Sequence, residues 1–116
     1  MSTASEEILA RYAKIEREAD SFGRLIGVKR LRPAQQLRVS EMVDTKDDIS
    51  SAMFNIAASV CEVDSVPVTF PLTRAELDSV IDMLDVEGTK AASAALGRLL
   101  GAGDPTVQVE DAAKIS

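Results

Sequence analysis

The sequence predicts a mainly α fold, in which four or five short helices enclose a small β-hairpin or strand element in a single domain. Most of the chain carries apolar residues at helical spacing, whereas residues 21–32 and 62–71 break that period with glycine or proline. A chain of 116 residues also has room for only one modest core. We therefore expect an N-terminal helix over residues 1–20, a compact helical domain with the small β element over residues 21–101, and a mobile C-terminal tail over residues 102–116.

The first helix is predicted over residues 5–20. Apolar side chains recur there at helical spacing, at Ile8, Tyr12, Ile15 and Ala19. Glu6 and Glu7 lie in the first turn, where the helix dipole favours acidic residues. Because a helix this short is marginal alone, it must pack on the domain or on a partner, or else fray. Residues 21–32 contain two glycines and place Ile26 and Val28 on one face of an extended chain, which predicts a strand or bent hairpin.

A second helix is predicted over residues 33–43, because the fixed φ of Pro33 suits the first turn of a helix. The third helix has the clearest pattern, and Asp47 or Asp48 can cap its first turn. Its apolar face comprises Ile49, Ala52, Met53, Ile56, Ala57, Val60 and Cys61. We expect this helix to be the centre of the core and Cys61 to be a small buried hydrophobic residue.

Alternating apolar residues with interspersed prolines predict an edge strand or extended arm near residues 66–70, after a turn at Asp64 and Ser65. Thr73 and Glu76 form a capping box that begins the fourth helix. The buried stripe of that helix is Leu77, Val80, Ile81 and Leu84. An alanine-rich final helix is expected to begin between residues 85 and 89 and to end near residue 100.

The composition excludes several kinds of chemistry. The chain has one cysteine and no histidine, so a Ser-His-Asp or Cys-His catalytic set, a His-containing zinc site and an internal disulfide are all excluded. No signal peptide is predicted, and no apolar run approaches the roughly 20 residues that cross a bilayer. We expect a protein that is not an enzyme, needs no cofactor and does not enter a membrane.

Charge is unevenly distributed along the chain: residues 1–20 sum to −2, residues 21–38 to +5 and residues 39–116 to −9. The basic stripe consists of Arg24, Lys29, Arg30, Arg32 and Arg38. Such a stripe could touch nucleic-acid phosphates. The acidic remainder and the single aromatic residue of the stretch instead favour pairing with the protein's own acidic helices or with an acidic partner.

A ladder of carboxylates at Asp78, Asp82 and Asp85 could in principle hold a hard cation. The chain contains no calcium-loop sequence, so we prefer the interpretation that these acids form a solvated helix face.

Apolar segments offer the strongest sign of function, because they could bind another chain. The predicted partner-binding residues lie on the third helix and on the arm that follows it: Met53, Ile56, Val60, Val66, Val68 and Phe70. Methionines on three predicted helices could adapt to an amphipathic partner helix, and the arm could pair along a free sheet edge. Self-association into a homo-oligomer is a further option.

Two segments, GRLIGVKRLRPAQQLRVSEM and NIAASVCEVDSVPVTFPLTRAELDSVIDMLDVEGTKAASAAL, resemble tail assembly chaperones of long-tailed bacteriophages and related prophages. The resemblance runs from about Phe22 to Leu100 and rests on the order of features: a basic strand, a helix after proline, an alanine-rich helix, a VDSVPV turn and a helix pair. Ser65 stands where that turn is expected to carry glycine.

The resemblance implies a non-catalytic protein of the host bacterial cytoplasm. Such a protein binds and solubilises the phage tape measure protein, leaves when tail tube proteins polymerise around it, and is absent from the mature virion. Two alternatives stay open. One is a structural component of the particle, such as a tail completion or head–tail joining protein. The other is a small nucleic-acid-binding regulator.

Overall fold

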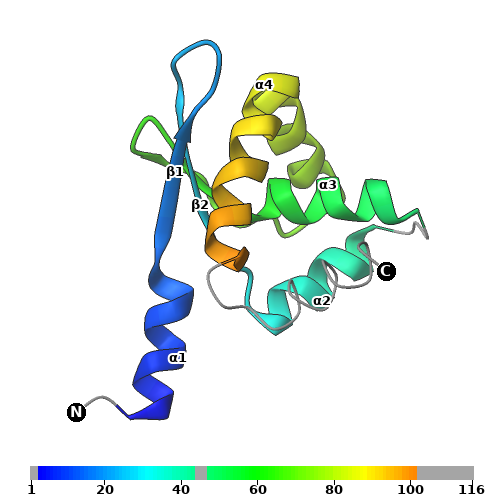
Figure 1. The fold of residues 1–116 in the computed structure, drawn as a ribbon. Coiled ribbons are helices and arrows are strands. Elements are labelled where there is room, and N and C mark those ends of the chain that lie inside the picture. The colour runs from blue at the N-terminus through cyan, green and yellow to red at the C-terminus, as the bar shows by residue number, and fades with distance from the viewer. Residues whose placement is uncertain (1–2, 44–46, 102–116) are drawn as a thin grey trace, which may run out of the picture.

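A computed structural model describes residues 3–43 and 47–101 (Figure 1). Within these ranges four helices and a four-stranded antiparallel sheet follow one another as α1(Ala4–Ala13), β1(Ile15–Ala19), β2(Leu25–Lys29), α2(Pro33–Met42), α3(Asp48–Ser59), β3(Val60–Val63), β4(Val66–Pro67) and α4(Arg74–Gly101). The fold is therefore mixed α/β. The expected short helices are present, but the prediction of a mainly α protein is corrected, because the β element is a complete sheet. The predicted tail, 102–116, lies outside the described residues.

The sheet has the strand order β1-β2-β3-β4, and every neighbouring pair is antiparallel. Two hairpins, β1–β2 and β3–β4, are joined side by side through β2 and β3, while α2 and α3 occupy the connection between them. The β3–β4 turn is the predicted one, with Asp64 at φ 50° and Ser65 at φ 67°. Positive φ at both central residues matches the twist that a two-residue hairpin loop needs. Ser65 therefore adopts the left-handed conformation without being glycine.

The predicted first helix is wrong in its second half, because α1 ends at Ala13 and residues 15–19 form the edge strand β1. Contacts from distant parts of the chain explain the difference. Arg17 lies opposite Gly27 of β2, and Arg98 of α4 donates hydrogen bonds to the side chains of Glu16 (3.3 Å) and Glu18 (3.0 Å). These tertiary contacts override the local helical pattern.

The core lies between the sheet, α3 and α4. Ile26 and Val28 of β2, together with Leu77 and Leu84 of α4, are its most completely buried large side chains. Alanines of α3 and of the second part of α4 complete it with close helix contacts (Ala57, Ala58, Ala91, Ala92, Ala95).

Two details of this region differ from expectation. The third helix stops at Ser59, so that Val60 and Cys61 belong to β3 and Cys61 is only half-buried. Of the predicted arm, only Val66–Pro67 forms the strand β4, and the N–H of Val68 adds one more hydrogen bond, to the carbonyl of Cys61 on β3 (2.8 Å).

Gly27 makes room for an ion pair on one surface of the sheet, because it has no side chain. Arg17, Gly27 and Glu62 lie side by side across β1, β2 and β3, and the guanidinium of Arg17 pairs with the carboxylate of Glu62. A Cβ atom added at Gly27 would lie 2.4 Å from Cγ of Glu62. Glycine at this position therefore lets the Glu62 side chain lie flat across β2.

Candidate functional site

A sharp break in α4 organises the surface that we regard as the candidate functional site. The helix is interrupted at Asp85, whose backbone has φ 58° and ψ −172°. A residue other than glycine in this region costs on the order of 1–3 kcal/mol. The Asp85 carboxylate accepts a hydrogen bond from the N–H of Val86 (2.7 Å), and the Thr89 hydroxyl donates to the Asp85 carbonyl (2.7 Å). The break lies within the predicted boundary between the two C-terminal helices.

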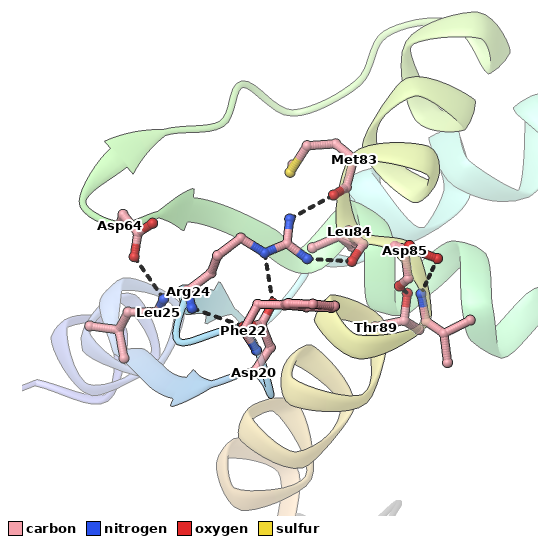
Figure 2. Close-up of polar contacts among 10 residues, drawn as sticks. Asp20, Phe22, Arg24, Leu25, Asp64, Met83, Leu84, Asp85 and Thr89 are labelled. Carbon is pink, nitrogen blue, oxygen red and sulfur yellow. Dashed lines mark hydrogen bonds and ion pairs between the residues drawn. The ribbon is translucent and has the colours of Figure 1, made fainter.

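The β1–β2 turn holds the break in place through Arg24 (Figure 2). Its guanidinium donates to the carbonyls of Met83 (2.8 Å) and Leu84 (2.7 Å), which end the first part of α4. A cation at this position also complements the negative end of the helix dipole. Close approach depends on Gly88, because a Cβ atom there would lie 3.1 Å from Nη2 of Arg24.

Asp20 in turn fixes Arg24. Its buried carboxylate accepts hydrogen bonds from Nε of Arg24 (2.7 Å), from the N–H of Arg24 (2.8 Å) and from the N–H of Phe22 (3.0 Å). Burial is the largest single influence on this carboxyl and by itself would raise its pKa. The hydrogen bonds, led by that from the Arg24 side chain, together outweigh burial, so the pKa of Asp20 lies below its ordinary value of 3.8.

An apolar groove of about 350 Å³ opens beside the break, between α3 and α4. Met53 of α3 and Ile81 and Val86 of α4 supply its apolar lining, and Met53 and Val86 are exposed. Polar residues complete the lining: Asp82, Asp85, Thr89 and Lys90. The groove thus has an apolar lining with charged residues around it. Asp82 lies before the break, Asp85 lies at the break, and Lys90 follows it. In chemical terms the groove can hold apolar side chains of a partner, with charged groups at its rim.

The predicted partner-binding residues do not form one surface. Met53 lines the groove, and Val66 is 65% exposed on β4. Val60 is only 2% exposed, so its prediction as a contact residue is corrected: it packs in the core as the first residue of β3. Three others are half-buried and pack against that core: Ile56, Val68 and Phe70.

Sequence reasoning missed two residues of the groove, Ile81 and Val86. Ile81 was expected in the buried stripe of its helix, where it is in fact half-buried. Val86 immediately follows Asp85, the residue at the helix break. The only sign of its role in the sequence is that it is an apolar residue at the start of the last predicted helix. Their proximity to Met53 depends on how α3 crosses α4, which no local pattern reports.

The basic stripe is not a continuous surface either. Arg24 caps the first part of α4, and Nη2 of Arg30 donates to the carbonyl of Leu99 (2.9 Å) near the end of the helix. Two of the five cations therefore bind the ends of the protein's own helix segments. The other three are exposed on β2, before α2 and on α2: Lys29, Arg32 and Arg38.

The acid ladder is divided between two environments. The carboxylate of Asp78 accepts a hydrogen bond from Nε of Arg74 (2.9 Å), whereas Asp82 and Asp85 border the groove. Among the residues described, no group of three or more His, Cys, Asp or Glu side chains is arranged to hold a metal ion.

No protein-family model, curated protein sequence or solved structure matches this chain. Over the described ranges, none of the helices combines the length and the apolar character needed to cross a membrane. The groove and its supports thus define a candidate binding site by their geometry alone.

Proposed function

We propose that this protein is a non-catalytic chaperone that holds an amphipathic helix of a client protein in the groove beside the α4 break. The proposed client is a phage tape measure protein, whose long helix exposes apolar stripes until tail tube subunits enclose it. The sequence resemblance described above suggests this client, and the apolar groove is the single structural observation that carries the binding role.

The shape and chemistry of the groove suit a helix. Apolar side chains three or four residues apart on a client helix could insert between Met53, Ile81 and Val86. The thioether of Met53 adapts to side chains of different shape, which suits a client with many similar but unequal sites. Asp82 and Asp85 at the rim favour client sites that carry lysine or arginine next to the apolar stripe.

Backbone strain gives a second reason to regard this place as functional. The strained residue Asp85 borders the groove, and two further groups hold the break: Arg24 from the adjoining turn and the Thr89 hydroxyl. Strain of this kind persists where surrounding contacts enforce it, and it is concentrated at binding and active sites. The break lies between Ile81 and Val86, so that a straight α4 would not bring these two residues into the lining of the groove in their present arrangement.

Binding of synthetic tape measure segments to the full chain, followed by fluorescence anisotropy, tests the proposal. Val86→Asp places a charge among the apolar residues and should weaken binding at least about tenfold. Leu37→Asp is the matched control, because Leu37 is equally exposed but lies on α2; it should bind like the wild type. Equal affinities of the two variants, with their fold confirmed by circular dichroism, would remove the groove from the proposal.

Co-expression provides a second test at the level of the whole client. A tape measure protein that aggregates alone should become soluble with the wild type and stay insoluble with Val86→Asp. Purified particles distinguish the structural alternative, because a fixed copy number of this chain in the virion contradicts a chaperone that leaves. The regulator alternative predicts DNA retention that falls steeply with salt, but Arg24 and Arg30 already bind helix ends.

A further inference from the structure

Two opposite charges line the candidate groove from different parts of α4. Asp82 lies about one turn before the break and Lys90 lies about one turn after Val86. Both residues are exposed. Within residues 3–43 and 47–101, neither the Asp82 carboxylate nor the Lys90 ammonium takes part in a hydrogen bond or an ion pair. These two charges are therefore available to groups that enter the groove.

The break in α4 puts the two charges on different walls of the groove. Ile81 and Asp82 precede Asp85, whose backbone departs from helical dihedral angles, whereas Val86 and Lys90 follow it. Because the chain changes direction at Asp85 and both parts of α4 still line one groove, the two parts form two walls. The wall before the break carries the acid, and the wall after the break carries the base.

Each charge borders the apolar part of its own wall. Around the helix axis, Lys90 lies about 40° from Val86, and Asp82 lies about 100° from Ile81. The carboxylate of Asp85, at the break itself, already accepts a hydrogen bond from the N–H of Val86 (2.7 Å). An apolar side chain that packs against Ile81 and Val86 thus has a carboxylate on one side and an ammonium group on the other.

From this arrangement we propose that the groove selects client helices whose apolar stripe has basic residues along one flank and acidic residues along the other. The inference rests on the proposed function and specifies which client segments the groove binds. Lysine or arginine on the first flank pairs with Asp82, and glutamate or aspartate on the second flank pairs with Lys90. A segment with bases on both flanks loses the second pair and places a like charge opposite Lys90.

The same two charges fix the direction in which such a client helix lies. A helix turned end for end keeps its apolar stripe in the groove but exchanges its two flanks. Its basic flank then faces Lys90 and its acidic flank faces Asp82, so that both attractive pairs become repulsive. Copies of the protein on successive segments of one long client helix therefore point the same way wherever the flanks keep their charges.

Four synthetic helical peptides with the same leucine stripe test this selectivity. Their flanks carry lysine and glutamate, lysine on both sides, glutamate on both sides, or uncharged glutamine on both sides. Fluorescence anisotropy gives their affinities for the full chain in roughly 0.15 M salt, where exposed charges more than about 8 Å apart are largely screened. The wild type should bind the lysine–glutamate peptide about fivefold more tightly than either peptide with like-charged flanks.

Lys90→Glu makes both walls acidic, so the two-lysine peptide should now bind about fivefold more tightly than the lysine–glutamate peptide. Lys90→Gln, a milder change, should bind these two peptides equally. Lys29→Glu is the matched control, because it makes the same change of charge at an exposed residue of β2 that does not line the groove. It should keep the wild-type preference, and circular dichroism verifies that all three variants are folded.

The glutamine peptide separates this inference from the proposed function, because it probes the apolar lining alone. If it binds but the wild type does not prefer the lysine–glutamate peptide, the charge selectivity is wrong and the apolar groove stands. An equal shift of preference in Lys29→Glu and Lys90→Glu also overturns the selectivity, because the net charge of the protein then explains it. If none of the four peptides binds, the proposed function fails as well.

Discussion

Replacing Arg24 by methionine tests whether the break in α4 is held from outside the helix. The substitution keeps much of the aliphatic length and removes the guanidinium, which donates to the carbonyls of Met83 and Leu84 and to Asp20. Both carbonyls belong to the end of a helix segment and have no intrahelical N–H to accept from. The variant therefore leaves the helix end and the buried carboxylate without their common donor.

The magnitude follows from the number and setting of these bonds. A hydrogen bond to a charged donor is worth about 1.5–3 kcal/mol. The Arg24 side chain is 28% exposed, so water replaces part of the loss and the lower figure applies. The two carbonyl bonds then account for about 3 kcal/mol of unfolding free energy, and the lost bond to Asp20 acts in the same direction. For a domain of this size that corresponds to a fall in Tm of roughly 12–24 °C.

Urea unfolding followed by far-UV circular dichroism measures the difference. Arg38→Met is the matched control, because Arg38 is exposed on α2; its unfolding free energy should stay within about 0.5 kcal/mol of the wild type. Arg24→Lys should be intermediate, since one ammonium group cannot serve two carbonyls and a carboxylate as a planar guanidinium does. If Arg24→Met and Arg38→Met unfold at the same urea concentration, Arg24 does not hold the break.

Three further outcomes are expected. Because the pKa of Asp20 is lowered in the folded state, its ionised carboxylate stabilises the fold fully at neutral pH, and this stabilisation is lost as the pH falls below about 3.8. Asp20→Asn should therefore lose less unfolding free energy between pH 7 and pH 3 than the wild type does. An equal loss in the two proteins would contradict this. Gly27→Ala should cost about 1–3 kcal/mol by displacing Glu62, and the cost should shrink when Glu62→Ser is added; strictly additive costs would refute the contact. Burial raises the pKa of the Cys61 thiol, so it should react with a disulfide reagent more slowly in the native protein than in urea; equal rates would show that the thiol is freely accessible.

Val68 illustrates how the structure changes the design of a binding test. The sequence predicts Val68 as a partner-binding residue, and on that basis Val68→Asp would be a natural test of client binding. Val68 is half-buried against the core, and its N–H donates to the carbonyl of Cys61 (2.8 Å). A carboxylate at this position would therefore destabilise the fold itself. Val66, which is exposed on the same strand segment, separates the two effects.

Much of the helical architecture is decided by neighbours in the sequence. Pro33 begins α2, and the side chain of Asp47 accepts hydrogen bonds from the first amides of α3. Thr73 accepts from the N–H of Glu76 (3.2 Å), although the Glu76 carboxylate reaches back to Leu72 (2.6 Å) instead of Thr73. These signals were readable because caps and fixed dihedral angles act within about four residues.

The β sheet and the groove, by contrast, depend on which distant segments meet. Residues 15–19 look helical until β2 offers a pairing edge and Arg98, about 80 residues later in the chain, binds their side chains. The roles of Arg24 at the break and of Met53 beside Val86 likewise arise only when separate elements pack together. Hydrophobic burial has no direction of its own, so composition and periodicity determined that these residues would find apolar neighbours, whereas the tertiary fold decided which ones.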